Sequence, residues 1–257
     1  MQPHDFIVTT IREAGKLLLK LRDKGFETST KGGDPRDIVT SVDLEVNNFI
    51  VARIKDAFPE DAIYSEESGG MSSAKRIWAI DPIDGSANFS RGIPHYAVCL
   101  GLLESGIPTV GAVYNPVTDE LFSFEKGRGA FLNDKRISVS ATTELSKASL
   151  FLHAGRKPEL WTWGGESYTK LLGAANKIAN YGGSALDACF VAAGRIEGNI
   201  YGRLTVMDIA SAIGILLEAG GRVVNERGEP IPFSTEPTKV VMSNNESIER
   251  AIIEKIF

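Results

Sequence analysis

The segment WAIDPIDGSANF, residues 78–89, sets two carboxylates and a glycine directly behind an apolar run. Residues 77–80 predict a short buried strand that delivers Asp81 to its carboxyl end. Asp84 follows three residues later, so we expect the two carboxylates to converge on one point. Gly85 lets the backbone approach a ligand closely, because it carries no side chain. This pattern predicts a ligand site at the end of the strand.

Phosphate ester chemistry needs both kinds of group that this segment brings together. Carboxylate oxygens bind hard cations such as Mg²⁺, and helix N-termini bind phosphate oxygens. Residues 86–88 predict a short helix whose N–H groups face the same point as Asp81 and Asp84. A metal ion between carboxylate and phosphate would remove the repulsion between like charges. The alternative is a purely structural turn in which either aspartate caps the helix.

With 43% hydrophobic and 24% charged residues, the 257-residue chain has the composition of one large globular domain or two closely packed ones. Its net charge of −5 argues against general nucleic-acid binding. The N-terminus lacks a signal-peptide layout and no apolar run approaches a membrane span, so we expect a cytoplasmic protein without membrane contact. Cys99 and Cys189 lie in apolar runs, which indicates buried thiols, although spacing alone leaves a disulfide open.

Two helices are predicted in the first quarter of the chain. Apolar residues recur at helical spacing over residues 5–24, and Gly25 follows as a stop. The polar segment STKGGDPRD, residues 29–37, predicts a loop. Residues 40–43, TSVD, resemble a capping box at the start of a second helix, which ends at Phe58-Pro59.

The rest of the chain alternates between strand and helix signals. Short β-like runs bounded by turn residues predict strands at residues 62–65, 76–80, 96–104, 109–115, 120–126, 148–153, 198–202, 222–225 and 239–243. Helical patterns cover residues 184–193, 207–219 and a last helix that Asn245 caps. These signals predict an α+β fold of layered helices and sheets, with a change of subdomain near residues 140–150.

Residues 78–98, WAIDPIDGSANFSRGIPHYAV, resemble the signature of the inositol monophosphatase family. That family includes archaeal-type fructose-1,6-bisphosphatases and 3′-phosphoadenosine 5′-phosphate phosphatases. Three further segments follow the family's order: DIVTSVD at 37–43, YSEES at 64–68 and VMDIASAIGILLEAGG at 206–221. The resemblance implies a layered α-β-α-β-α sandwich. It also implies an N-terminal half, residues 1–145, that carries most metal ligands, and a C-terminal half, residues 146–257, that adds Asp208 and substrate contacts.

The resemblance implies hydrolysis of a phosphate monoester by water, with two or three Mg²⁺ ions. It places one ion on Glu66, Asp81 and the Ile83 carbonyl, where it would lower the pKa of a bound water. A second ion, on Asp81, Asp84 and Asp208, would stabilise the leaving alkoxide. A third, weaker ion could bind near Glu66. Without the resemblance, Asp208 would be interpreted as the N-terminal cap of a long helix.

Asp43, Ser86 and Glu66 are the catalytic residues that the resemblance implies. Asp43 would lie beside the attacking water, paired with the hydroxyl of Ser86, and the two would accept the proton of the water. The family usually has threonine at position 86, so the hydroxyl is retained here. Asp43 taken alone could be a helix cap. Lys31 matches a family lysine near the outer metal, but a surface lysine is an equal alternative.

The substrate contacts that the resemblance implies come from both halves of the chain: Asp84, Gly85, Ser86, Gly183, Ser184, Ala185 and Arg203. The amides of Gly85 and Ser86 would hold the phosphate. Tyr201 stands where eukaryotic inositol enzymes carry a substrate-binding glutamate, and Met207 stands where the family commonly has tryptophan. Arg203 resembles archaeal dual-specificity members and suits a second phosphate. Fructose 1,6-bisphosphate therefore joins inositol 1-phosphate as a candidate substrate.

Three alternatives to this function remain. A covalent phosphatase of the haloacid dehalogenase type needs a nucleophile and an acid two residues apart, whereas Asp81 and Asp84 are three apart. A non-catalytic sugar-phosphate binding module could keep the same ligands. A 3′-phosphoadenosine 5′-phosphate phosphatase would need a stacking surface, which Trp161 and Trp163 could supply, although such aromatic pairs are more often core or interface.

Zinc chemistry and the oligomeric state are weakly marked in the sequence. His4, His95 and His153 are scattered and none has a partner at metal-ligand spacing, so we do not expect zinc. The family usually forms dimers, and the apolar strands between residues 96 and 124 could supply the interface. The expected partners are therefore a small phosphorylated substrate and a second copy of the chain.

Overall fold

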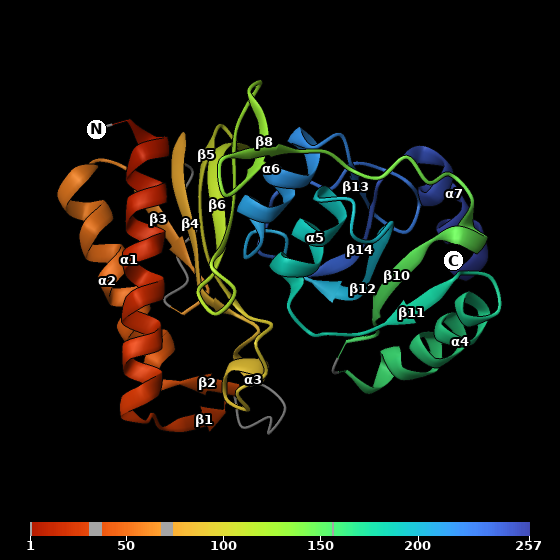
Figure 1. The fold of residues 1–257 in the computed structure, drawn as a ribbon, viewed down its shortest axis with the longest axis horizontal. Coiled ribbons are helices and arrows are strands. Elements are labelled where there is room, and N and C mark those ends of the chain that lie inside the picture. The colour runs from red at the N-terminus through yellow and green to blue at the C-terminus, as the bar shows by residue number, and fades with distance from the viewer. Residues whose placement is uncertain (1, 31–37, 68–73, 156) are drawn as a thin grey trace.

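Two large β-sheets alternate with layers of helices (Figure 1). The computed structural model describes residues 2–30, 38–67, 74–155 and 157–257. From left to right, Figure 1 shows an outer pair of helices, a seven-stranded sheet, a middle pair of helices, a five-stranded sheet and a second outer pair. The structure therefore confirms the layered α-β-α-β-α arrangement of the predicted α+β fold.

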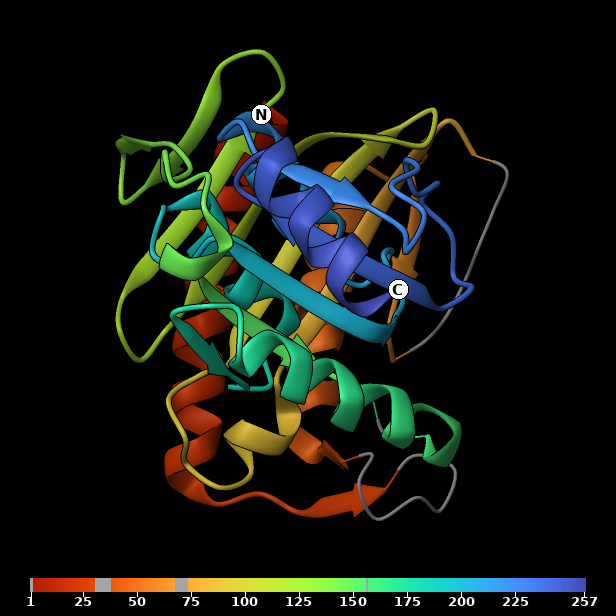
Figure 2. The same cartoon turned by 90° about the vertical axis from the view of Figure 1, so that its right-hand side faces the viewer.

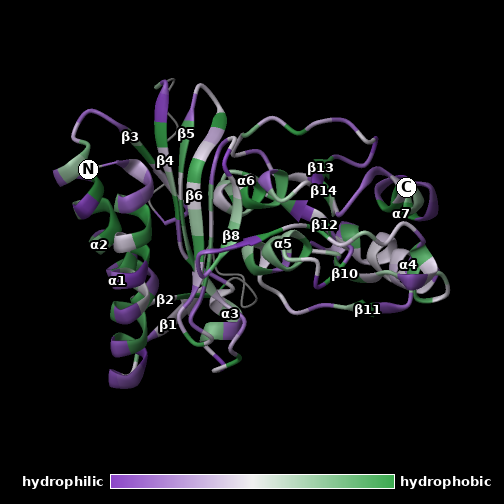
Figure 3. Ribbon diagram, turned by 45° about the horizontal axis from the view of Figure 1, so that its top comes forward, coloured by the Kyte–Doolittle hydropathy of each residue, from purple (hydrophilic) through white to green (hydrophobic). Residues whose placement is uncertain are grey.

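The longer helices of the described chain pair up by layer. The pairs are α1 (Pro3–Lys24) with α2 (Ser41–Ala57), α5 (Ser184–Ala192) with α6 (Ala210–Glu218), and α4 (Trp161–Leu172) with α7 (Glu246–Ile256). Figure 2 looks onto α4 and α7, which lie across the smaller sheet. Figure 3 shows that the middle pair is largely apolar, as its place between two sheets requires. No helix among the described residues combines the length and apolar character needed to cross a bilayer.

The larger sheet runs in the order β3-β4-β5-β6-β7-β8-β9. Its strands are β3 (Ala62–Ser65), β4 (Arg76–Asp84), β5 (Ala97–Glu104), β6 (Ile107–Asn115), β7 (Glu120–Glu125), β8 (Gly129–Leu132) and β9 (Lys135–Ile137). Strands β3 and β4 are parallel, and the remaining neighbours are antiparallel hairpins. The strands predicted between residues 62 and 126 are present, and β4 extends four residues beyond the predicted 76–80. Since β3 and β4 are parallel, both bring their carboxyl ends to the same edge.

The smaller sheet runs in the order β11-β10-β12-β14-β13. Its strands are β10 (Ser149–His153), β11 (Lys177–Ala179), β12 (Gly198–Leu204), β13 (Arg222–Val224) and β14 (Thr238–Ser243). The two sheets thus divide the chain between residues 137 and 149, while one apolar core cluster joins Phe124 of β7, Cys189 of α5 and Met242 of β14. The division into halves at residues 145 and 146 stays a prediction.

Predicted helix ends are confirmed where a side chain or a glycine marks them. Gly25 follows α1 with φ 89°, a conformation that favours glycine. Thr40 and Asp43 form the predicted capping box of α2. Asn245 accepts a hydrogen bond from the amide of Ile248 and so caps α7.

Several local predictions differ from the structure. Within the predicted loop 29–37, residues 29 and 30 belong to strand β1 (Thr28–Thr30), which pairs with β2 (Ile38–Thr40). Strand β1 is exposed, and neither strand shows the apolar alternation that reveals a half-buried strand. Strands β8, β9 and β11 and helix α4 were likewise not predicted. Helix α6 begins at Ala210, because residues 205–208 close a turn through the hydrogen bond from the Asp208 amide to the Thr205 carbonyl.

Close backbone packing places α6 against the larger sheet. A Cβ atom on Gly111 of β6 would lie 2.9 Å from the Phe124 ring and 3.0 Å from Ser211. A Cβ on Gly214 of α6 would lie 2.0 Å from the same ring. The glycines therefore allow α6, and the turn before it, to approach the sheet. Cys99 and Cys189 are buried free thiols, as predicted, and burial raises the pKa of both.

Candidate active site

A β-bulge brings Asp81 and Asp84 to the same face of β4. Asp81 lies opposite Cys99 of β5, and Asp84 lies opposite Ala97, so three residue steps on β4 match two on β5. In a regular strand, residues three apart point to opposite faces. The extra residue in the bulge restores the alternation. The strand therefore continues through Asp84, and the prediction that it ends at Asp81 was wrong.

Asp81 is a buried carboxylate, 4% exposed, surrounded by other carboxylates. Burial raises its pKa well above the ordinary value, and the charges of Glu66, Asp84, Asp208 and Asp43 raise it further. The charges that act most strongly on Asp81 are therefore all negative. These five predicted site residues come from four separate sequence segments. The structure brings them close enough for the charges of the other four to raise the pKa of Asp81.

Asp84 is held by the first turn of α5. The amide and hydroxyl of Ser184 donate to Oδ1 at 3.0 and 2.6 Å, and the amide of Ala185 donates to Oδ2 at 2.9 Å. A carboxylate at a helix N-terminus is stabilised by the exposed amides. Burial raises the pKa of Asp84 to about 6, although these hydrogen bonds oppose the change. Ser184 and Ala185, predicted as substrate contacts, thus also position a predicted metal ligand.

Asp43 and Ser86 form the predicted pair. Ser86 Oγ lies 2.8 Å from Asp43 Oδ1 and 2.9 Å from the carbonyl oxygen of Ile83. The amide and hydroxyl of Thr40 donate to Asp43 Oδ2 at 2.8 and 2.5 Å. Burial is the main cause that raises the pKa of Asp43. Asp43 is therefore both a helix-capping residue and the partner of Ser86.

Gly85 shapes the loop that presents Ser86. Its φ of 89° is left-handed, and a Cβ there would lie 2.9 Å from the His95 carbonyl oxygen. Both observations require glycine. The predicted short helix follows as α3 (Ser86–Phe89). The side chain of Asn88 ties this helix to the carbonyls of His95 and Tyr181 at 2.9 and 2.7 Å.

Glu66 and Asp208 reach the site from β3 and from the turn before α6. The Glu66 amide donates to the Ile80 carbonyl at 3.2 Å, which continues the pairing of β3 with β4. Asp208 Oδ1 accepts a hydrogen bond from Tyr64 Oη at 2.7 Å. The N-cap position of α6 is Ile209, so Asp208 lies one residue before the cap that the alternative interpretation assigned to it. Sequence reasoning missed Tyr64.

Another buried carboxylate, Asp187, was also missed. Its oxygens lie 2.8 Å from His95 Nε2 and 3.0 Å from His153 Nε2, and Tyr201 Oη donates to it at 3.1 Å. Burial alone would raise the pKa of Asp187, but the hydrogen bonds from His153 and His95 lower it. Two of the three scattered histidines, His95 and His153, therefore meet at Asp187 in the fold. Their spacing in the chain carries no signal of this cluster.

The remaining predicted residues are placed as follows. Arg203 lies on β12 with an exposed side chain, and no hydrogen bond or ion pair holds it among the described residues. Gly183 precedes α5, where a Cβ would lie 2.9 Å from the His95 ring. Lys31 falls outside the described residues. Trp163 stacks on Phe257 near the C-terminus, 5.5 Å between ring centroids.

The donor set fits a hard divalent cation. Within the described parts of the chain, no three carboxylate, imidazole or thiol side chains already lie together as a metal-binding group. The carboxylates around Asp81 nevertheless offer only oxygen, the donor that Mg²⁺ prefers. Their mutual repulsion in a buried position is relieved by a bound cation. The ligand assignments stay a prediction.

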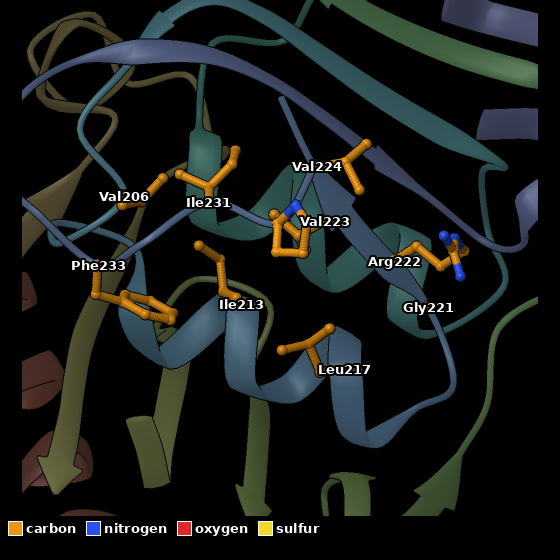
Figure 4. Close-up of a pocket in the computed structure, with 10 residues that line it drawn as sticks. Val206, Ile213, Leu217, Gly221, Arg222, Val223, Val224, Ile231 and Phe233 are labelled. Carbon is orange, nitrogen blue, oxygen red and sulfur yellow. The ribbon is translucent and has the colours of Figure 1, made fainter. Parts of the chain in front are cut away.

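A cavity of about 330 Å³ lies between α6 and β13 (Figure 4). Ile213, Val223 and Phe233 line it, and Val206 connects it to the turn that carries Asp208. Arg222 at its rim is paired with Glu249 at 2.6 Å. None of the predicted ligand carboxylates is among the described residues that line the cavity.

Comparison with known proteins agrees with this arrangement. The model of the inositol monophosphatase family matches residues 2–256. An inositol-1-monophosphatase of Bacillus subtilis is 33% identical over 248 residues, 95% of this chain and 92% of that protein. A fructose-1,6-bisphosphatase/inositol-1-monophosphatase of Thermotoga maritima is 33% identical over 225 residues, 88% of this chain and 85% of that protein. The structure of an inositol monophosphatase from Thermotoga maritima matches with a TM-score of 0.90 and 30% identity, covering 100% of this chain and 97% of that one. The chain therefore belongs to the inositol monophosphatase family of phosphoric monoester hydrolases.

Proposed function

We propose that this chain is a Mg²⁺-dependent phosphatase of sugar or cyclitol phosphate monoesters, with inositol 1-phosphate and fructose 1,6-bisphosphate as candidate substrates. The observation that carries the proposal is the environment of Asp81, a buried carboxylate whose strongest neighbouring charges are four further carboxylates. Such a group suits a cation and, through it, a phosphate. Relatives named for both substrates match most of this chain.

The cation site is formed by Glu66, Asp81, Asp84, Asp208 and the Ile83 carbonyl. Bound divalent cations, two or three of them, supply Lewis acidity for the phosphate oxygens and for water. The chain's own contribution is to hold the oxygens in place. The bulge in β4 orients Asp81 and Asp84, and α5 fixes both oxygens of Asp84.

Ser86 and Asp43 take the proton of the attacking water. The proton passes to Ser86 Oγ as the Ser86 hydroxyl proton moves to Asp43 Oδ1, 2.8 Å away. The raised pKa of Asp43 makes it a stronger base than an exposed aspartate. Thr40 holds the other carboxylate oxygen, so Oδ1 stays directed at Ser86.

Substrate recognition is assigned to both halves of the chain. The amides of Gly85 and Ser86 hold the phosphate that is cleaved, at a loop that only glycine can form. Gly183 and Ser184, at the start of α5, face the rest of the substrate. The exposed guanidinium of Arg203 is suited to a second phosphate, which fructose 1,6-bisphosphate has and inositol 1-phosphate lacks. We further propose a cytoplasmic homodimer.

A substrate panel tests the proposal. Purified protein is assayed for phosphate release from inositol 1-phosphate, fructose 1,6-bisphosphate and 3′-phosphoadenosine 5′-phosphate, with Mg²⁺ and after chelation. We expect Mg²⁺-dependent release from one or both of the first two. Arg203→Ala should lower kcat/KM for the bisphosphate more than for inositol 1-phosphate. Absence of release from every substrate would favour a binding module, and preference for the nucleotide would reject the sugar assignment.

A further inference from the structure

Tyr64 lies among the predicted ligand carboxylates. Its side chain is 7% exposed, and its Oη donates to Asp208 Oδ1 at 2.7 Å. The charges that act most strongly on the phenol are those of Asp208, Glu66 and Asp81. Tyr64 is thus a hydrogen-bond donor that faces the acidic group and carries no charge of its own.

The backbone of Asp208 is not part of a helix, so a side-chain contact can help to orient its carboxylate. Asp208 lies in a turn closed by the hydrogen bond from its own amide to the Thr205 carbonyl at 3.2 Å, two residues before α6 begins at Ala210. By comparison, Asp81 lies within a strand, and both oxygens of Asp84 are held by the start of α5. A carboxylate on a turn loses more conformational freedom when it becomes a metal ligand than a carboxylate on a strand does.

Tyr64 is itself held rigidly. It lies on β3 and pairs with Ala79 of β4. Its ring belongs to a buried cluster with Ala79, Leu103, Met207 and Ala210. Met207 directly precedes Asp208, so the same ring that donates the hydrogen bond also packs beside the turn. A fixed donor on a sheet can therefore define the orientation of the Asp208 carboxylate.

We propose that Tyr64 is a positioning residue that orients the carboxylate of Asp208 for cation binding. The inference rests on the proposed function, because it assigns Asp208 to the cation site. A phenol is suited to this task. It directs a carboxylate through one hydrogen bond, whereas a lysine or arginine would neutralise the charge that attracts the cation.

Tyr64→Phe tests the inference, with Tyr114→Phe as a matched control. Tyr114 is 6% exposed and donates to Asp119 at 2.8 Å, but it lies on β6 against α1, where a Cβ on Gly15 would meet its ring. Each substitution removes one oxygen and one hydrogen bond. Chelator-treated proteins are titrated with Mg²⁺ by calorimetry and thermal unfolding, and the Mg²⁺ dependence of phosphate release is measured on the best substrate.

We expect Tyr64→Phe to raise the Mg²⁺ concentration at half-saturation about five- to tenfold, as loss of one such hydrogen bond implies. We expect kcat at saturating Mg²⁺ to stay within about twofold of the wild type, because only ground-state ligand orientation is lost. Tyr114→Phe should leave the Mg²⁺ titration unchanged. Unchanged or tighter Mg²⁺ binding by Tyr64→Phe would overturn the inference.

A double-mutant cycle shows whether Tyr64 acts through Asp208. In an Asp208→Asn background, Tyr64→Phe should weaken Mg²⁺ binding no further, and an additional loss equal to that of the single variant would contradict the assignment. The two proposals fail differently. A wild-type protein that binds Mg²⁺ but hydrolyses nothing on the panel refutes the proposed function alone, whereas one that binds no Mg²⁺ also overturns the role of Tyr64.

Discussion

Asp81 and Asp187 are both buried, yet their surroundings are opposite. Asp187 accepts hydrogen bonds from two histidines and a tyrosine, and these lower its pKa against the effect of burial. Asp81 is surrounded by carboxylates, and both burial and their charges raise its pKa. The fold places hydrogen-bond donors around Asp187 and gathers other negative charges around Asp81. Buried ionisable groups whose pKa is strongly shifted by burial and by like charges are typical of functional sites.

The largest effect on activity is expected when Asp81 is replaced. Asp81→Asn removes an oxygen ligand that both proposed cation positions share, so phosphate release should fall by about a thousandfold or more. The protein should remain folded, because an uncharged amide replaces a repelled carboxylate. Phosphate release and circular dichroism measured on the same sample check both statements. Turnover close to that of the wild type would reject Asp81 as a ligand.

Ser86 should show the next largest effect. Ser86→Ala removes the hydroxyl that lies 2.8 Å from Asp43 and should lower kcat about a hundredfold, as expected for a lost proton-transfer group. Ser86→Thr retains the hydroxyl and serves as the control, with activity near that of the wild type. Equal losses of kcat in the two variants would show that the shape of the side chain at position 86 limits activity, and not the proton transfer by its hydroxyl.

Asp187→Asn should act mainly on stability. The substitution leaves His95, His153 and Tyr201 without their shared carboxylate, so the free energy of unfolding should fall by roughly 2–4 kcal/mol. Denaturant unfolding measures this change. In cation-free buffer, Asp81→Asn should instead raise the free energy of unfolding. An unchanged unfolding midpoint in Asp187→Asn would mean that the cluster is not a stabilising contact.

The pH dependence of the cation-free protein should be a smaller effect. Asp84 has a raised pKa of about 6 in the folded protein, against about 3.9 in an unfolded chain. The folded state therefore binds more protons between these values, and this group makes the protein more stable as pH falls from 7 towards 4. Unfolding measured from pH 7 to 5 should show a slope that Asp84→Asn reduces. An identical slope in the variant would assign the effect to other groups.

Elements with a strong local signal could be predicted from the sequence, and those defined by distant contacts could not. The capping box at Thr40 and Asp43 and the long apolar strands are local, and they were predicted correctly. Strand β1 is exposed along its length, and the three residues of β2 are too few to show an apolar period. The start of α6 was placed three residues early, because the apolar pattern continues through the turn before it.

The same distinction applies to the site. The motif around Asp81 and Asp84 identified the predicted ligands through family resemblance. The hydrogen bonds that hold them were missed, since they join residues far apart in sequence: Ser184 with Asp84, 100 residues apart, and Tyr64 with Asp208, 144 apart. The Asp187 cluster likewise depends on three strands or loops that meet only after folding.

The stability of Asp81→Asn with and without Mg²⁺ separates a cation site from an ordinary buried carboxylate. In chelator-treated samples, the variant should unfold at a higher temperature than the wild type, because one repelled charge is gone. Mg²⁺ at a hundred times its Kd should stabilise the wild type by about 2.7 kcal/mol and the variant far less. A variant that is less stable than the wild type in chelator, together with a wild type that Mg²⁺ does not stabilise, would contradict the assignment of this acidic group to cations.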